Sequence, residues 1–246
     1  MSKVFSLVPL HKNSRWNSVG KDFSRLIFPA SCVSCNEELT INEHEICLFC
    51  TRELSFTDFE KYDEATSLDQ KFWGRIQLEN TFALCYFEQD KAIQSIIHHL
   101  KYKNNYKLGV LCGEMIGRRL KDLSILTTAD ALIPVPLHHR KEFIRSYNQS
   151  EALAKGIQKC VNLPIIKDLI HKKLHTESQT RNNRFLRWEK AQEQFQLNKK
   201  KHFNFQHIVI VDDVITTGST LEAMAQEIRS LYPTVKISII SLAVVQ

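Results

Sequence analysis

Apolar and polar positions along this chain predict strands separated by helices from about residue 78 onward. Short runs rich in β-branched and aromatic residues, typical of buried strands, occupy residues 81–87, 131–135, 208–211 and 236–245. Weaker runs at 163–166 and 169–171 are further short strand candidates. Because strands that alternate with helices build a mostly parallel sheet with right-handed crossovers, we expect an α/β fold.

Apolar residues at helical spacing mark the helices between these strands. One stripe, which Asp90 is expected to cap, consists of Ile93, Ile96, Ile97 and Leu100; a second consists of Leu108, Leu111, Cys112 and Met115. Residues 148–161 and 221–231 are predicted to form further helices. By contrast, residues 51–77 are charged and weakly periodic, which indicates a linker or short helices. We therefore divide the chain into an N-terminal segment, 1–77, and a larger domain, 78–246.

The most informative stretch runs from Ile208 to Thr220, IVIVDDVITTGST, where a buried strand ends in two aspartates and a hydroxyl-rich turn follows. Open α/β sheets bind phosphorylated ligands at the carboxyl ends of their strands, beside a helix N-terminus. The turn offers a phosphate the hydroxyls and backbone N–H groups of Thr216, Thr217, Gly218, Ser219 and Thr220. Asp212 and Asp213 could accept hydrogen bonds from the vicinal diol of a ribose. The simpler alternative is an ordinary βα turn whose aspartates cap the helix.

Four of the seven cysteines form two C-x-x-C pairs, Cys32 with Cys35 and Cys47 with Cys50, with eleven residues between the pairs. Two such pairs in a reducing compartment are a common way to build a closed tetrahedral zinc site, which we expect within residues 28–60. With four protein ligands no position remains for water, so the zinc should be structural. A redox C-x-x-C pair is the alternative, and His44 is a substitute ligand.

Composition indicates a cytoplasmic protein. Of the 246 residues 43% are apolar, enough for a core, and no run approaches the ~18–20 apolar residues of a membrane helix, so membrane insertion is not expected. The first residues lack the pattern of a secretory signal. An odd number of cysteines argues against a secreted disulfide framework, since Cys85, Cys112 and Cys160 look like isolated core residues.

The stretch around Asp212 resembles the signature of the type I phosphoribosyltransferases, which bind phosphoribosyl pyrophosphate (PRPP). The resemblance implies that Asp212 and Asp213 are the catalytic acidic pair that holds the ribose hydroxyls, and that residues 216–220 wrap the 5′-phosphate. It also implies a pyrophosphate loop at His138, His139, Arg140 and Lys141, and a mobile catalytic loop within residues 171–194 that includes Gln179, Arg181 and Arg184. Each of these cations could equally be a solvated surface charge.

Several motifs, taken in order, resemble one subgroup of these proteins. They are Phe28-Pro29 before the first C-x-x-C pair, IIHHLKYK at 96–103, PVPLHHR at 134–140, RSYNQ at 145–149, TESQTR at 176–181 and VDDVITTG from Val211. Together with the paired cysteines they make the chain similar to the ComF family, which joins an N-terminal zinc module to a phosphoribosyltransferase domain. One departure is Ser146, where the family commonly has glycine. Because serine lacks the freedom of glycine to take a positive φ, we expect a differently shaped loop there.

Two functional hypotheses follow from the resemblance, since the ComF family is linked to natural competence in bacteria. In the first, the protein binds PRPP and handles single-stranded DNA during transformation, with a competence helicase as a further implied partner. In the second, it is an active phosphoribosyltransferase. Mg²⁺ then bridges the pyrophosphate and ribose oxygens, and an unidentified acceptor attacks the anomeric carbon with release of pyrophosphate.

Charge is concentrated in the segments expected around the ligand. Residues 138–202 hold 15 Lys or Arg against 6 Asp or Glu, a net of +9, whereas the whole chain has +6. Such a surface attracts PRPP and single-stranded DNA alike. Residues 199–205, KKKHFNF, mix cations with aromatics as in a base-stacking strip, although three lysines before a strand are also typical of a solvated loop.

Overall fold

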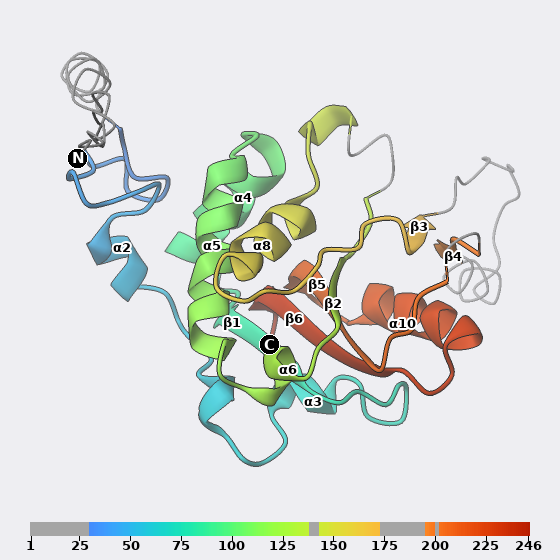
Figure 1. The fold of residues 1–246 in the computed structure, drawn as a ribbon. Helices are drawn as coiled ribbons and strands as arrows, with labels where there is room; N and C mark the ends of the chain where they lie inside the picture. The colour runs from blue at the N-terminus through green and yellow to red at the C-terminus, as the bar shows by residue number, and fades with distance from the viewer. Residues whose placement is uncertain (1–29, 138–142, 173–194, 200–201) are drawn as a thin grey trace, which may run out of the picture.

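The computed structural model describes residues 30–137, 143–172, 195–199 and 202–246. Its centre is a parallel sheet with the spatial order β1 (Thr81–Tyr86), β6 (Lys236–Val244), β5 (His207–Ile215) and β2 (Ala131–Pro134) (Figure 1). Beyond β2, Ile165 forms one parallel bridge to Leu132, so the predicted strand at 163–166 is present only as this bridge. The predicted α/β fold with a mostly parallel sheet is confirmed.

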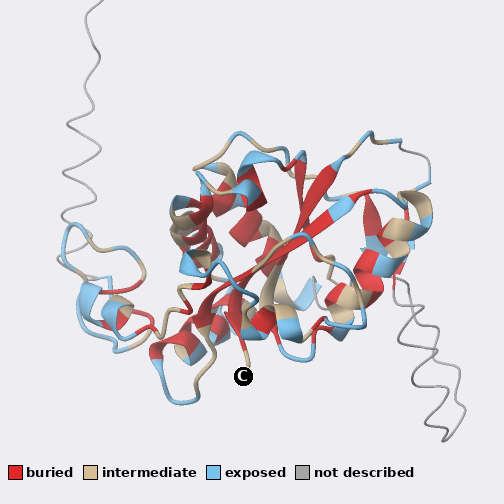
Figure 2. Ribbon diagram, turned by 90° about the horizontal axis from the view of Figure 1, so that it is seen from below, coloured by how far each residue is buried: buried red, intermediate tan, exposed pale blue. Residues whose placement is uncertain are grey.

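Helices cover both faces of the sheet. Along the chain α4 (Ala92–Tyr102) and α5 (Tyr106–Leu120) follow β1, and α8 (Gln149–Gln158) follows β2; these three helices pack together (Figure 1). α10 (Ser219–Leu231) follows β5 on the opposite face (Figure 2). The opposite face is required because the connection from β5 to β6 crosses the sheet in the reverse direction and must still be right-handed. The neighbouring strands β2 and β5 therefore lead to opposite faces, which makes a topological switch point between them.

The strands are buried between these helix layers, as Figure 2 shows in red. In β6 every residue after Lys236 is buried, and in β5 burial is continuous from His207 to Val211. Short helices complete the described chain: α2 (Leu48–Arg52), η1 (Phe59–Lys61), α3 (Ser67–Gln70) and α6 (Ser124–Thr127). Among the described helices, none combines the length and the apolar character that crossing a bilayer requires.

Glycines allow α5 and α8 to pack closely. A Cβ atom at Gly113 would lie 2.1 Å from the carbonyl oxygen of Leu153, and one at Gly156 would lie 2.1 Å from that of Val110. This glycine face forms part of the buried side of α5. Consequently Leu111 and Met115, which were predicted to be buried, are only half-buried, although Leu108 and Cys112 are buried as predicted.

The residues between α2 and β1 pack against the edge of the sheet. The N–H of Thr57 donates to the carbonyl of Leu84 (3.1 Å), and that of Tyr86 donates to the carbonyl of Ser55 (2.8 Å). This segment therefore covers the outer edge of β1, where unpaired backbone groups would otherwise be exposed. The short helices predicted here are present as η1 and α3.

Three boundaries differ from the predictions for physical reasons. β5 continues to Ile215, so Asp212 and Asp213 lie inside the strand rather than after it. Asp90 does not cap α4, because it has φ 57°, donates its N–H to the side chain of Gln94 and precedes the N-cap residue, Lys91. The strand predicted at 169–171 is β3 (Ile170–Lys172), which pairs antiparallel with β4 (Phe195–Leu197) outside the central sheet.

The loop before α8 has the conformation that glycine would favour. Ser146 has φ 61°, so it adopts the positive φ that serine was expected to avoid. A residue with a Cβ atom in this left-handed region carries a strain of roughly 1 kcal/mol or more. The serine therefore occupies a position at which its own side chain is unfavourable.

We expect Ser146→Gly to raise the free energy of unfolding by up to about 1 kcal/mol, because the strain is removed. Urea denaturation of the two proteins measures the difference. Ser230→Gly is the matched control, since Ser230 lies exposed inside α10, where glycine should lower stability by roughly 0.5–1 kcal/mol. A Ser146→Gly protein that is less stable than the parent would contradict the strain argument.

Candidate functional site

The candidate ligand site begins where β5 extends past β2. Pro134, the last residue of β2, pairs with Val211, and β5 continues beyond this pair through Asp212 and Asp213. The oxygen Oδ1 of Asp212 accepts hydrogen bonds from the hydroxyl of Ser150 in α8 (3.3 Å) and from the N–H of Asp213 (2.8 Å). Burial, and next the charge of Asp213, raise the pKa of the Asp212 carboxyl above its usual range.

The second carboxylate is held by α4. Lys101 Nζ lies 3.2 Å from Asp213 Oδ2, and both side chains are largely buried, at 24% and 15% exposed. The N–H of Val214 donates to Oδ1 of the same carboxylate (2.8 Å). Lys101 thus partly balances the charge of the aspartate pair.

The sequence analysis did not single out Lys101 or Ser150. Lys101 lies inside the IIHHLKYK motif, and Ser150 comes directly after RSYNQ. Both residues therefore lie in or beside a motif that the sequence analysis named. The roles could not be inferred, because they depend on how α4 and α8 lie beside β5.

The loop after β5 leaves its hydroxyls accessible. Thr216, Thr217 and Ser219 are exposed, and the hydroxyls of Thr217 and Ser219 lie 3.0 Å apart. Gly218, with φ 76°, is the N-cap residue of α10, and no side chain caps this helix. The aspartates therefore do not act as helix caps, and the simpler explanation of the turn is wrong. The N–H of Ser219 donates to the hydroxyl of Thr217 at 3.5 Å, and the start of α10 otherwise presents backbone N–H groups to an anion.

The segment before β1 supports this loop from behind. Arg75 donates through Nη1 to the carbonyl of Thr217 (2.7 Å) and through Nε to the carboxylate of Glu222 in the first turn of α10 (3.0 Å). A Cβ atom at Gly218 would lie 2.7 Å from the ring of Phe72, so a larger residue would have to displace that ring. The sequence analysis missed Phe72 and Arg75, because they lie in the segment with little periodicity.

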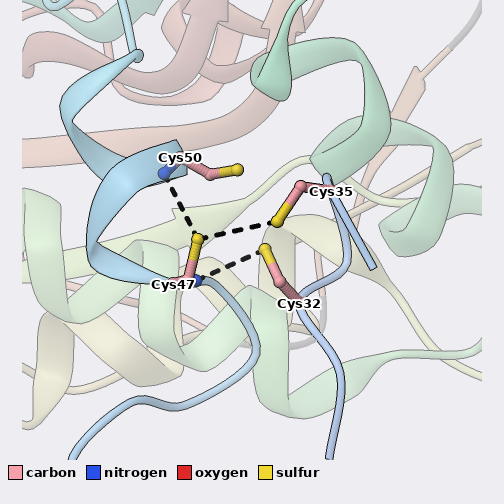
Figure 3. Close-up of side chains that lie close together, drawn as sticks. All are labelled: Cys32, Cys35, Cys47 and Cys50. Carbon is pink, nitrogen blue, oxygen red and sulfur yellow. Dashed lines mark hydrogen bonds between the residues drawn. The ribbon is translucent and has the colours of Figure 1, made fainter. Parts of the chain in front are cut away.

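The four paired cysteines come together in the N-terminal segment (Figure 3). Their Sγ atoms all lie within 4.8 Å of one another, and those of Cys35 and Cys47 are 3.7 Å apart. Two thiolates on a tetrahedral zinc, each about 2.3 Å from the metal, would be about 3.8 Å apart. The N–H of Cys47 donates to Cys32 Sγ (3.3 Å), and that of Cys50 donates to Cys47 Sγ (3.4 Å). The cluster could hold a metal such as zinc.

At Cys32 backbone donors favour the thiolate that a metal requires, whereas burial raises the pKa of the Cys50 thiol to about 12. Burial raises the pKa of the Cys32 thiol, but the N–H groups of Cys35, Cys47 and Ser34 outweigh it and lower the pKa to about 7. His44 is exposed and lies outside the four-cysteine cluster of the described residues. The remaining cysteines are free, with Cys85 and Cys112 buried as predicted and Cys160 half-buried.

Seven predicted site residues lie outside the described part of the chain, namely His138, His139, Arg140, Lys141, Gln179, Arg181 and Arg184. The described neighbours show where these segments leave the fold. Residue 137, the last one described before the first gap, follows the carboxyl end of β2, and β3 and β4 bring residues 172 and 195 side by side.

Comparison with known proteins agrees with this geometry. A model of the phosphoribosyl transferase domain matches residues 153–246, which contain β5, its following loop and α10. The carboxyl-terminal part of this chain is a phosphoribosyl transferase domain. Competence protein F of Haemophilus influenzae is 24% identical over 219 residues, which cover 83% of this chain and 93% of that protein.

Two further relatives carry the name DNA utilization protein YhgH. The one from Shigella flexneri is 27% identical over 224 residues, which cover 82% of this chain and 91% of that protein, and the one from Escherichia coli K12 is 26% identical over the same length. The resemblance to the ComF family is confirmed, because these homologues cover more than four fifths of this chain, the phosphoribosyl transferase domain matches its carboxyl-terminal part, and the four-cysteine cluster fits a zinc module.

We expect replacement of Cys47 and Cys50 by serine to release about one zinc per chain and to destabilise the protein by several kcal/mol, because metal binding supplies folding free energy. Elemental analysis of the purified protein and urea denaturation measure the two effects. Cys160→Ser, outside the cluster, should change neither. A double variant that is as stable as its parent would contradict a structural metal.

We expect Asp212→Asn to raise the free energy of unfolding at pH 8 by about 1–3 kcal/mol, since one pKa unit corresponds to about 1.4 kcal/mol. Asparagine keeps the oxygen that Ser150 and the N–H of Asp213 bind, and it removes a charge that burial disfavours.

The sign of the pH dependence follows from the raised pKa of Asp212. Between its folded and unfolded pKa values the folded parent binds more protons, so its stability rises as pH falls. The advantage of Asp212→Asn should therefore shrink between pH 8 and pH 5. Asp58→Asn is the control, because the guanidinium of Arg119 lowers the pKa of Asp58 and the effect of that change should be constant over this range. An equally constant difference for Asp212→Asn would contradict the raised pKa.

Proposed function

We propose that this chain binds PRPP together with Mg²⁺ and handles single-stranded DNA during its uptake. One observation carries the first half of this proposal, namely the pairing of two carboxylates with a hydroxyl-rich loop at the switch point between β2 and β5. The second half is supported by the names of the relatives, Competence protein F and DNA utilization protein YhgH.

In this proposal the two aspartates accept hydrogen bonds from the ribose 2′- and 3′-hydroxyls. Residues 216–220 surround the 5′-phosphate with hydroxyls and with the N–H groups at the start of α10. The pyrophosphate is neutralised by His138, His139, Arg140 and Lys141, which follow β2, and Gln179, Arg181 and Arg184 close over the ligand. Mg²⁺ enters with the ligand, because it prefers phosphate and carboxylate oxygens and retains part of its water shell.

An active phosphoribosyltransferase is the second candidate. The aspartate pair would then favour the positive charge that develops at the anomeric carbon when pyrophosphate leaves. Lys101 supports this candidate because it holds Asp213 in a fixed position, with an Nζ–Oδ2 distance of 3.2 Å. The acceptor would have to enter from the side of the ribose ring opposite the pyrophosphate.

The N-terminal segment, 1–77, serves in this proposal as a zinc-stabilised module attached to the domain at 78–246. We place the protein in the cytoplasm, because four thiols stay available to a metal only in a reducing compartment. A competence helicase is proposed as a partner on the ComF resemblance alone.

We expect calorimetric titration with PRPP and Mg²⁺ to show binding to the parent and at least about 100-fold weaker binding to Asp212→Asn/Asp213→Asn. The loss follows because hydrogen bonds to charged groups contribute about 1.5–3 kcal/mol each. The exposed pair Asp63→Asn/Glu64→Gln removes the same charge elsewhere and should bind like the parent.

The outcomes separate the two candidates. No binding to a folded, zinc-loaded parent would refute the PRPP site. Binding that the Asp212→Asn/Asp213→Asn variant loses would support the site, and pyrophosphate release in a screen of acceptors would then identify an active transferase.

A further inference from the structure

A group of exposed aromatic side chains lies next to the candidate PRPP site. Tyr102 is 66% exposed, Tyr106 44% and Phe143 89%, at the turn between α4 and α5 and in the loop before α8. Lys103, Lys107 and Arg145 accompany them along the chain. We name these six residues the aromatic–basic strip.

Contacts between the two segments hold the strip together. The guanidinium of Arg145 lies over the ring of Tyr102, 5.8 Å from its centroid, and Tyr106 meets Tyr147 edge to face at 5.6 Å. The hydroxyl of Tyr147 donates to the carbonyl of Leu100 in α4 (2.7 Å). The strip is therefore built before any ligand binds, which lowers the ordering entropy that binding would otherwise require.

The strip adjoins the aspartate pair through α4. Lys101, which contacts Asp213, directly precedes Tyr102 in the last turn of that helix. A ligand on the strip would consequently lie beside the PRPP site.

Charge distinguishes this surface from a second pair of exposed aromatics, Tyr62 and Trp73. Along the chain no Asp or Glu occurs between Asp90 and Glu114, and residues 98–107 contain two histidines and three lysines. In space acidic groups meet the strip at its Tyr106 end, where Glu45 accepts a hydrogen bond from Asn105 (2.6 Å) and lines a cavity with Tyr106 and Lys107. Tyr62 and Trp73, by contrast, line an acidic cavity of about 490 Å³ together with Asp63, Glu64, Asp69 and Glu79. Phosphates are attracted to the strip and repelled from that cavity.

The KKKHFNF segment is less suited to bases than its composition suggested. The rings of Phe203 and Phe205 stack on each other, 4.8 Å apart and nearly parallel, and Phe205 also contacts Tyr232. Both phenylalanines are half-buried against the core. The aromatic residues of the strip also have neighbours, but they remain 44–89% exposed.

We propose that single-stranded DNA binds along the aromatic–basic strip. Unpaired bases stack on Tyr102, Tyr106 and Phe143, and the cations of Lys103, Lys107 and Arg145 neutralise the neighbouring phosphates. Duplex DNA fits poorly, because its bases are already stacked inside the helix. This inference rests on the proposed DNA-handling function and assigns it a surface.

The test is fluorescence anisotropy of a labelled oligo(dT) with the full-length protein. Stacking contributes roughly 5- to 150-fold per base when one aromatic is replaced by alanine, so Tyr102→Ala/Phe143→Ala should weaken binding at least about 20-fold. Tyr102→Phe keeps the ring and should bind like the parent. Lys103→Gln/Lys107→Gln should lower the slope of log affinity against log salt by roughly 0.7 per lysine.

Tyr62→Ala/Trp73→Ala is the matched control, because it removes two exposed aromatics from the acidic cavity and should leave oligo(dT) binding unchanged. PRPP titration of Tyr102→Ala/Phe143→Ala should match the parent, which shows that the variant is folded.

Two results would overturn the inference, and only the second would also refute the DNA half of the proposed function. If the parent binds oligo(dT) and Tyr102→Ala/Phe143→Ala binds it equally well, the strip is wrong and the proposed function stands. If the parent binds no oligo(dT) at any salt concentration, the DNA half of the proposed function fails as well.

Discussion

The site requires that two carboxylates, which are neighbours on one strand, be held close together despite their mutual repulsion. Groups from two helices bind the carboxylates of Asp212 and Asp213, namely Ser150 from α8 and Lys101 from α4. The position of α8 in turn depends on glycines that let it approach α5 within backbone contact. The distance between helices in the layer above the sheet therefore determines the electrostatics of the strand below.

Residues with positive φ occur around the same rim, and Asn36, Glu45, Asp58 and Asp90 have positive φ elsewhere in the described chain. The three segments that surround the aspartates each contain a residue with positive φ: Asn104 between α4 and α5, Ser146 before α8, and Gly218 after β5. Only Gly218 can adopt that conformation without steric strain. Together with the raised pKa of Asp212, this is the pattern expected where a site is preorganised at the expense of stability.

The amino-acid pattern was sufficient for the fold class, the positions of the main strands along the chain and the four-cysteine cluster, because these depend on local periodicity and on spacing. It was not sufficient for contacts that join distant segments. Arg75 and Thr217 are an example, since nothing near Arg75 in the sequence indicates that it supports a loop after β5. The end of β5 was missed for a related reason. Two adjacent aspartates favour the end of a strand. In the structure Asp212 still pairs with Ser241 of β6, and each carboxylate accepts the N–H of the next residue.

The net charge of this protein does not predict which of its surfaces attracts a polyanion, because that depends on where the charges lie in the structure. The total of +6 combines an acid-free stretch from Lys91 to Gly113 with an acidic cavity at the start of β1. Aromatic side chains are exposed in both regions, so exposure alone does not select between them. A polyanion would meet an attractive potential at the first and a repulsive one at the second, and the difference grows as salt is lowered because the Debye length increases. Which face of this protein attracts a polyanion therefore depends on where its charges lie rather than on their sum.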